Sequence, residues 1–479
     1  MTGIVFGLIV FMVALVAVIG FGAVLHWRQH STTSLLPYIF YLAINNMAWQ
    51  VAISGRNLFA STLSDSADLI EPVLDMPPAV LWASRLTSLF IVVVAVERIV
   101  NRLLHYGQGI KIPTGLFVAF VFYFMSSVLF SAFLGTHPSL SHEYFYLFLG
   151  GIAALLFTEA DADNAICSAR NAIFMLLLAS AMFVVIKPEL VMRNDYMDGL
   201  IPGLTIRYVG LTAHSNVLGP LTVVFLLCLW SRPYSRGWLN GLAWFIGAAT
   251  LICAQSKTSW LTFILCLSCL AYFRYAAFLK GYFFDFKRPV FLAAFLSVGM
   301  VVVTMFAMTL MFGSAGNPLS TFFMSRAGAD LMTLTGRDEI WAIAVREWRY
   351  NPLFGYGLSI WNEAHRSKIG MPNAVTAHNQ FYQTLSSAGI VGVVGLCFYV
   401  LTLFWFALKT AKASQGLTLA FFIMVMMRSV SEVTLSMIGY YGPEELTHVL
   451  ILMVITSHWI AHRAPVANSQ ATPKFILAR

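Results

Sequence analysis

Repeated apolar runs of about 20 residues restrict what this chain can fold into more than any other feature. An α-helix of about 20 apolar residues is long enough to cross the hydrocarbon core of a bilayer. Hydrophobic residues make up 59% of the 479-residue sequence and charged residues only 10%. Soluble domains carry about 25% charged residues. The sequence therefore predicts an all-α polytopic membrane protein.

The apolar runs predict a bundle of about 12 to 13 transmembrane helices. The first run lacks the positively charged start of a signal peptide and is longer than the apolar part of one, so it predicts a membrane helix. The predicted spans are 2–25, 33–54, 78–97, 113–134, 144–158, 168–186, 213–230, 237–254, 258–279, 289–312, 386–408, 416–437 and 446–461.

Lysine and arginine residues concentrate in alternate loops. By the positive-inside rule this bias predicts an outer N-terminus and a cytoplasmic C-terminus. The same bias predicts that the two longest polar loops, 187–212 and 313–385, are extracytoplasmic. The net charge of +8 is no argument for a nucleic-acid partner, because the basic residues fall largely in short loops that set topology. The predicted organisation is N-terminal helices 1–190, central helices 191–312, a large periplasmic loop 313–385, C-terminal helices 386–463 and a cytoplasmic tail 464–479.

The loop 313–385 is the first place to look for chemistry, because structureless loops of this length are uncommon. Residues 337–350 predict an amphipathic helix with Trp341 on its apolar stripe. Arg337 begins this helix, where the helix dipole disfavours a cation. A role in binding an anion together with the free amide groups of the helix terminus is one interpretation. A structural salt bridge is the other, and Arg346 lies off the apolar stripe.

Two further stretches of the loop carry candidate residues. Gly355, Tyr356 and Gly357 predict a sharp turn of the backbone. His378 and Asn379 lie a few residues before the next predicted span, at the outer membrane surface. A neutral imidazole can take up a proton near neutral pH, so His378 is a candidate general base.

Outer positions elsewhere offer more fixed cations. Arg207 ends the 187–212 loop, shortly before His214 and Asn216, and Lys257 lies in a short outer turn. Together with Arg337, such a cluster suits a diphosphate, which arginine can grip in a bidentate manner. The alternative for each residue alone is a base that extends to the membrane interface.

Charges inside the predicted spans are expected to pair. Arg428 and Glu432 are one helical turn apart in the span 416–437, which predicts a structural ion pair. Arg85 is a lone base of the same kind. Cys266 and Cys269 form a CxxC without a second pair nearby, so we expect neither zinc nor a disulfide there.

These residues, in this order, resemble the O-antigen ligase/Wzy-type polymerase superfamily, and most closely its ExoQ-like exopolysaccharide polymerases. The resemblance covers about 200–440, and the first 190 residues match only as membrane helices. The matching pieces are Arg207 to Gly219, Ser256-Lys257, Thr335-Gly336-Arg337 with Trp341, Pro352 to Gly357, His378-Asn379 with Gly389 and Gly392, and Arg428 to Glu432.

The resemblance implies a GT-C-type glycosyltransferase whose donor is a polyprenyl-diphosphate-linked oligosaccharide and whose acceptor is a saccharide. It implies that His378 acts as the base and that Arg207 and Arg337 hold the diphosphate. Lys257 stands where the family often has arginine, so a point charge is kept and a bidentate contact is in doubt. Location in the bacterial inner membrane and partnership with chain-length regulators and export proteins are further expectations.

No metal and no cofactor are expected, because neither long outer loop contains a compact Asp-x-Asp pair. Distant carboxylates such as Asp195 and Asp338 could still meet in space. The leading hypothesis is a polymerase of extracellular polysaccharide. The alternatives are an O-antigen ligase acting on lipid A-core, transfer of glycan to protein, and a lipid-linked sugar flippase or secondary transporter. The absence of an internal repeat argues against a transporter.

Overall fold

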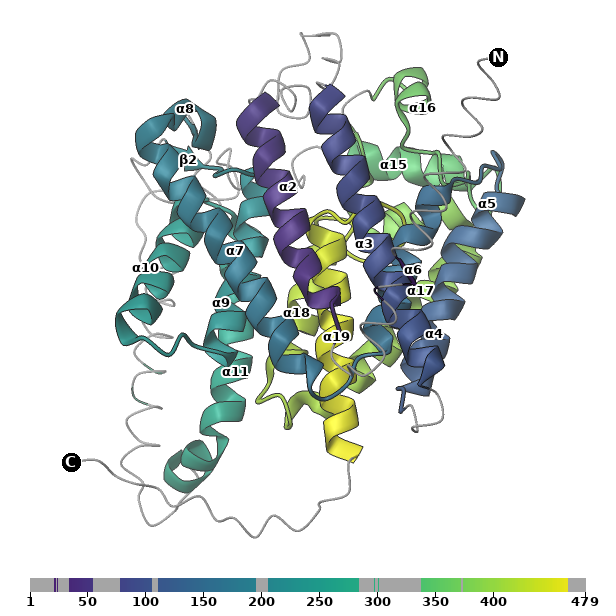
Figure 1. Ribbon diagram of the computed structural model, residues 1–479. Coiled ribbons are helices and arrows are strands. Elements are labelled where there is room, and N and C mark those ends of the chain that lie inside the picture. Colours follow the sequence, from purple (N-terminus) through teal and green to yellow (C-terminus); the bar gives the residue numbers. More distant parts are fainter. Residues whose placement is uncertain are drawn as a thin grey trace, which may run out of the picture.

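The computed structural model of the chain describes residues 34–54, 78–105, 111–194, 206–283, 337–371 and 374–463, and the single positions 21, 22, 24, 297 and 300. Within these residues the fold is a bundle of helices (Figure 1), and one two-stranded ladder, β1–β2, is its only sheet. The predicted spans 2–25 and 289–312 lie almost entirely outside the described residues, as do Thr335 and Gly336.

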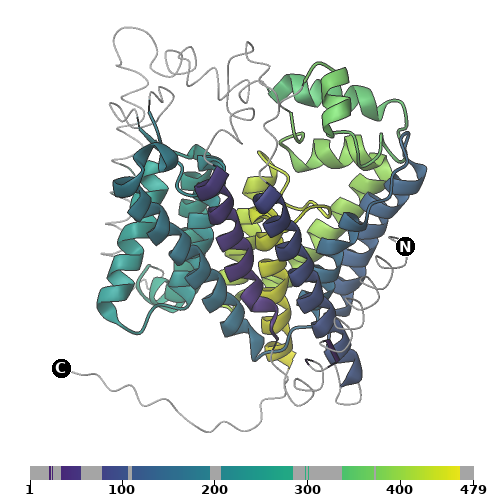
Figure 2. The same cartoon turned by 45° about the horizontal axis from the view of Figure 1, so that its top comes forward.

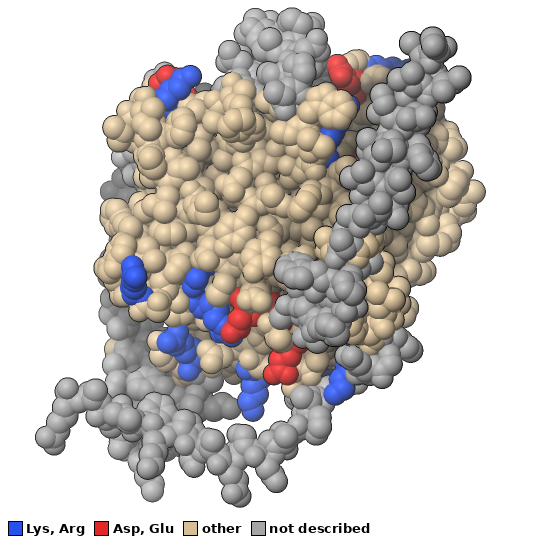
Figure 3. Space-filling model, viewed as in Figure 1, with Lys and Arg blue, Asp and Glu red and all other residues tan. Residues whose placement is uncertain are grey.

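The bundle helices run alternately between two ends of the molecule. Three described spans are long and apolar enough to cross a membrane, namely Thr114–Leu134, Asp161–Ile186 and Gln380–Ala411. On the face drawn in Figure 3, a broad band without Lys, Arg, Asp or Glu separates the charged groups near the two ends. The prediction of an all-α polytopic membrane protein is confirmed.

The bundle helices are α2 (Ile39–Ser54), α3 (Pro78–Leu104), α4 (Thr114–Phe124) with α5 (Phe130–Leu134), α6 (Tyr146–Leu155), α7 (Asp161–Ile186), α9 (Ser215–Ser231), α10 (Gly237–Cys253), α11 (Lys257–Phe283), α17 (Gln380–Ala411), α18 (Leu417–Ser429) and α19 (Pro443–Arg463).

Two helix ends differ from the predicted spans. α17 begins at Gln380, before the predicted 386, because the Asn379 side chain accepts hydrogen bonds from the amides of Phe381 and Tyr382 and so caps the helix. α18 ends at Ser429, well before the predicted 437. Glu432 therefore lies in the segment between α18 and α19 and not on a membrane helix.

One end of the bundle carries the non-spanning elements, and we call it the loop end (Figures 1 and 2). There α8 (Pro188–Val191) leads into β1 (Met192–Arg193), which pairs antiparallel with β2 (Arg207–Tyr208). The loop end also carries α15 (Arg337–Trp348) and α16 (Glu363–Lys368). Residues 337–371 and 374–379 together are called the loop domain.

The loop domain is joined to the bundle through a break in α17. Gly389 has φ 64° and ψ −161°, which interrupts the helix. The amides that the break frees bond to the turn after α15, since Ile390 and Val391 donate to the carbonyls of Pro352 and Leu353 at 2.9 and 3.1 Å. In return, the Tyr356 amide donates to the Ser386 carbonyl at 2.8 Å. The turn is thus hydrogen-bonded into the membrane helix.

Gly389→Ala is expected to destabilise the protein. Its φ and ψ belong to a region that is essentially restricted to glycine, at a cost of about 1–3 kcal/mol for other residues. An added Cβ would also lie 2.4 Å from the Leu353 carbonyl oxygen. Thermal unfolding in detergent measures the effect. Gly241→Ala is the matched control, because that helical position has no atom within 4 Å of a new Cβ. Equal melting temperatures for the two variants would contradict the prediction.

Candidate functional site

The apolar stripe of α15 packs inside the loop domain and against the bundle. Ala344 is fully buried in a small core with Tyr356 and Ile360. Trp341 stacks on Tyr382 of α17, with ring centroids 4.8 Å apart, and its indole Nε1 donates to the Ala377 carbonyl at 2.9 Å. Trp341 therefore positions the backbone immediately before His378.

Tyr356 and His365 form a polar contact within this core. The Tyr356 hydroxyl lies 2.8 Å from His365 Nδ1, and His365 Nε2 lies 3.7 Å from a Glu347 carboxylate oxygen, too far for a hydrogen bond. Burial lowers the pKa of His365, and the negative charge of Glu347 offsets only part of that shift. His365 is therefore held in its neutral form.

The loop domain is expected to loosen as the pH falls below about 6.5. Because the folded protein binds the His365 proton more weakly than the unfolded chain does, protonation favours unfolding. The stabilisation is complete above the ordinary histidine pKa of 6.5 and is lost as the pH falls toward the lowered one. Hydrogen exchange of residues 337–371 at pH 7.5 and 5.5 measures this. His365→Gln should remove most of the difference, and an unchanged pH response in that variant would refute the assignment to His365.

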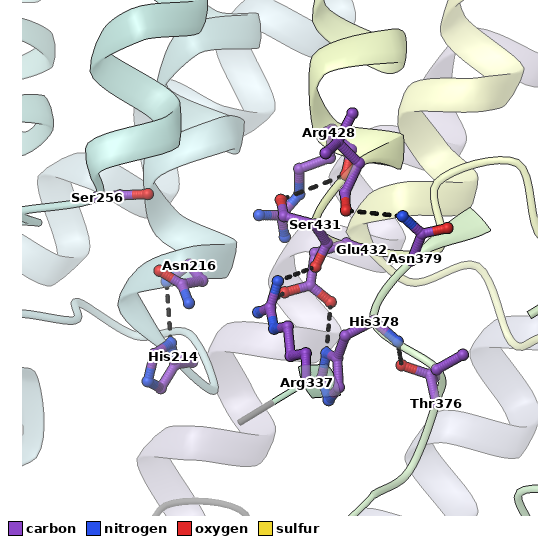
Figure 4. A network of polar contacts seen from close by, with 12 residues as sticks. His214, Asn216, Ser256, Arg337, Thr376, His378, Asn379, Arg428, Ser431 and Glu432 are labelled. Carbon is purple, nitrogen blue, oxygen red and sulfur yellow. Dashed lines mark hydrogen bonds and ion pairs between the residues drawn. The ribbon is translucent and has the colours of Figure 1, made fainter. Parts of the chain in front are cut away.

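Glu432 brings together two of the predicted site residues (Figure 4). Its Oε2 lies 3.0 Å from His378 Nδ1, and its Oε1 lies 3.5 Å from Arg337 Nη2. Arg337 Nη1 also donates to the Ser431 carbonyl at 2.7 Å. We call Arg337, His378 and Glu432 the Glu432 cluster. Their side chains are partly open to solvent, with exposed fractions of 17% for Arg337, 27% for His378 and 17% for Glu432.

The backbone around His378 is fixed on both sides. His378 has φ 47°, an uncommon value for a residue with a side chain. Its amide donates to the Thr376 hydroxyl at 3.2 Å, and the Asn379 side chain donates to the Val430 carbonyl at 3.0 Å while it caps α17. Strained residues held in this way concentrate at functional sites.

The contact with Glu432 selects the tautomer of His378. A carboxylate accepts hydrogen bonds, so the adjacent Nδ1 of a neutral imidazole must carry the proton. Nε2 is then the unprotonated nitrogen that is able to take up a proton. The geometry therefore suits a histidine base oriented by a carboxylate.

Charge compensation in the Glu432 cluster is nearly complete. Burial raises the pKa of the Glu432 carboxyl, but the hydrogen bond from His378 and the charges of Arg428, His378 and Arg337 outweigh it, and the net pKa is below the ordinary value. Burial lowers the pKa of Arg337, while Glu432 opposes that shift. Glu432 is therefore held as a carboxylate.

The predicted ion pair between Arg428 and Glu432 is wrong. Arg428 Nη2 instead lies 2.8 Å from Glu444 Oε1, at the start of α19. Because α18 ends at Ser429, the chain turns away from the helical path and directs Glu432 toward Arg337 and His378. The positive charge of Arg428 still acts on Glu432, although their side chains share no hydrogen bond or ion pair.

A second group of predicted residues gathers at the start of α9. Arg207 Nη2 donates to the Asn216 side chain at 3.1 Å, and its Nε donates to the Ala254 carbonyl at 3.3 Å. His214 Nδ1 accepts from the Asn216 amide at 3.0 Å and caps α9, so a neutral His214 carries its proton on Nε2. We call Arg207, His214 and Asn216 the Arg207 cluster. Figure 4 shows His214 and Asn216 on one side and the Glu432 cluster on the other.

The sequence reasoning missed Arg193. The register of the β1–β2 ladder places Arg193 directly opposite Arg207, and side chains directly opposite each other share one face of a ladder. Two like charges in this arrangement repel each other unless an anion or an acid compensates them. No local signal marks Arg193, because only the strand pairing brings it to Arg207.

The remaining predicted residues lie elsewhere. Lys257 begins α11, and its side chain has no hydrogen bond or ion pair with any described residue. Arg346 is exposed and pairs with Glu347 on the loop domain. Tyr356, inside that domain, also has no contact with the Glu432 cluster. The structure thus joins His378 and Arg337 directly and Arg207 with Asn216, and it leaves Lys257, Arg346 and Tyr356 outside both clusters.

Among the described residues no group of three or more His, Cys, Asp or Glu side chains is arranged to hold a metal ion. The Cys266 thiol donates to the Ala420 carbonyl of α18, and the Cys269 thiol donates to the carbonyl of Gly416, which precedes α18. Asp195 lies outside the described residues, and Asp338 is exposed at the start of α15.

Comparison with known protein families shows one similarity. Residues 242–397 match the model of the O-antigen ligase family, and this segment includes Lys257, Arg337 and His378. The predicted resemblance to the O-antigen ligase/Wzy-type superfamily is confirmed, whereas the ExoQ-like subtype stays a prediction. The chain is therefore a multi-pass membrane protein that is similar to this family over residues 242–397. No match was found among curated proteins.

Proposed function

We propose that the chain is an integral-membrane glycosyltransferase that polymerises polyprenyl-diphosphate-linked oligosaccharide repeat units into an extracellular polysaccharide. The observation that carries the proposal is the shared contact of His378 and Arg337 with Glu432 at the loop end. It pairs an oriented base with a fixed cation, which are the two groups that transfer of a sugar from a diphosphate requires. In this proposal the protein lies in the bacterial inner membrane with the loop end in the periplasm.

His378 would act on the acceptor. The acceptor hydroxyl oxygen attacks the anomeric carbon of the donor sugar, and its proton moves to His378 Nε2. The bond between that carbon and the diphosphate oxygen breaks, and the electron pair leaves with the diphosphate. Glu432 stabilises the imidazolium that forms, because a carboxylate next to Nδ1 favours the protonated ring.

The diphosphate would lie between the two clusters. Arg337 uses only part of its five N–H donors on Ser431 and Glu432, which leaves others for phosphate oxygens. Arg207 would add its positive charge. Arg193, opposite Arg207, adds a second positive charge on the same side. Fixed cations lower the barrier because they stabilise the charge that develops on the leaving group. Lys257 would contribute at most a point charge.

An O-antigen ligase is the second candidate function, because the family match bears that description. A ligase would use the same donor, base and clamp and would differ only in its acceptor, lipid A-core. Transfer to protein differs in the same way. A flippase or transporter would not need an oriented base on an outer segment.

Purified protein is expected to convert a polyprenyl-diphosphate-linked repeat unit into a ladder of longer lipid-linked glycans, with and without EDTA. In this proposal arginine side chains stabilise the negative charge that develops on the diphosphate, so we expect EDTA to leave the yield unchanged. Gel separation of the labelled products measures the reaction. Products only on added lipid A-core would favour the ligase over the polymerase. A reaction that stops with EDTA and resumes with a divalent ion would overturn the metal-independent mechanism.

A further inference from the structure

A cavity of about 480 Å³ lies outside both clusters, in the half of the bundle toward the loop end. It is lined by α2, α3, the start of α9, the segment that joins α18 to α19 and the start of α19. In Figures 1 and 2 this joining segment lies between the upper halves of α2 and α3. The volume falls within the range of about 300–1,000 Å³ that is usual for small-molecule sites.

The cavity wall carries polar side chains on membrane helices. Asn46 and Gln50 come from α2, and Ser84, Arg85 and Ser88 come from α3. Asn46 lies eight positions before the end of α2, which is about 12 Å below it at 1.5 Å per residue. Polar groups at such depth are costly and usually serve a function.

Pairing between the two helices accounts for only part of this set. The Gln50 side-chain amide donates to the Ser84 hydroxyl at 2.7 Å. The side chains of Asn46 and Arg85 form no hydrogen bond with any described residue, although Arg85 lies over the Trp82 ring. Donors and acceptors therefore remain for a ligand after the contact between α2 and α3 is satisfied.

We propose that this cavity binds neutral sugar residues of the glycan. Amides and hydroxyls dominate its polar wall, and these groups match sugar hydroxyls. A diphosphate would face only one cation, Arg85, together with the acidic Glu445. An isoprenoid chain would leave the Asn46 amide and the Gln50 side-chain carbonyl buried without partners, which is unfavourable.

The position of the cavity connects it to the proposed site. Ala213 lines the cavity, and the next residue, His214, belongs to the Arg207 cluster. Pro443 and Val217 line both this cavity and the small cleft that contains Arg428 and Glu444. A bound glycan could therefore extend from the cavity toward the start of α9. This inference rests on the proposed function and names where sugars of its donor or acceptor bind.

The first test is photo-crosslinking in cells that make the polymer. Asn46→p-benzoylphenylalanine is expected to capture glycan on the protein, whereas the same change at Asn45, which does not line the cavity, is expected not to. In the His378→Ala background, a single repeat unit on the protein would identify the donor. A ladder of lengths that appears only in the active protein would identify the acceptor chain.

The second test is kinetic and uses the purified protein with the lipid-linked repeat unit. Asn46→Leu combined with Gln50→Met is expected to raise KM about tenfold, the effect of losing two hydrogen bonds, while kcat changes little. Asn45→Leu is the control, with KM unchanged. These replacements remove polar groups from a membrane helix, so they should not impair folding.

The assignment of the cavity is overturned if no glycan is captured at position 46 or if positions 45 and 46 capture it equally. A normal KM in the double variant also overturns it. The proposed function fails separately, if His378→Ala leaves the polymer unchanged. A cavity without glycan in a protein that still needs His378 therefore rejects only this inference.

Discussion

His378→Ala is expected to lower the rate of glycan transfer by about 10²–10⁴-fold, the usual contribution of a general base. The loss should appear in kcat, because the imidazole acts on the acceptor proton in the transition state and adds little to donor binding. Initial rates with purified protein and a lipid-linked repeat unit measure it. In cells, the expected result is loss of polymer with normal levels of the protein.

Glu432→Gln tests whether the carboxylate orients this base. The amide keeps the size of the side chain but removes the charge and allows the wrong tautomer of His378, so we expect a loss of the same order. Glu339→Gln, an exposed carboxylate on α15, is the matched control. Full activity of Glu432→Gln would reduce the contact with His378, at 3.0 Å, to a structural one. Full activity of His378→Ala would remove the proposed base altogether.

Arg337→Ala is expected to lower kcat/KM by about 10²–10³-fold, the cost of removing one preorganised group that stabilises developing charge. Arg337→Lys should restore only part of the activity, because an ammonium lacks the planar fork that contacts Ser431 and Glu432. Rates over a range of donor concentrations separate the two parameters. Removal of a cation outside the cluster should leave the rate unchanged, so Arg349→Ala, at an exposed position directly after α15, serves as the control.

Arg337 also neutralises Glu432, so a fold defect must be distinguished from a catalytic one. The double variant Arg337→Ala with Glu432→Gln leaves no unpaired charge in the cluster. If Arg337 only compensates Glu432, the double variant should be more active than either single variant. We expect it to remain inactive with a melting temperature close to that of the parent protein.

The apolar runs determined the class of the protein and most helix positions. The helices that lie where apolar segments predict them include α2, α3, α4, α7, α9, α10, α11, α17 and α19. Such segments are a local signal, since each must separately satisfy its backbone in lipid. Local sequence also indicated His378 and Arg337 as candidates. His378 lies in a polar loop just before a predicted span, and Arg337 lies at the start of a predicted helix, where the helix dipole disfavours a cation.

Only the tertiary structure decided which groups meet. Glu432 bonds to His378 across 54 positions of sequence and to Arg337 across 95, and the early end of α18 directs it away from the expected Arg428. Arg193 meets Arg207 through strand pairing, and the turn at residues 352–357 bonds to a break in α17 at Gly389. These contacts depend on how distant segments pack, which no local pattern encodes. The sequence alone determined a membrane bundle with candidate residues at one end, and packing determined which of them share a site.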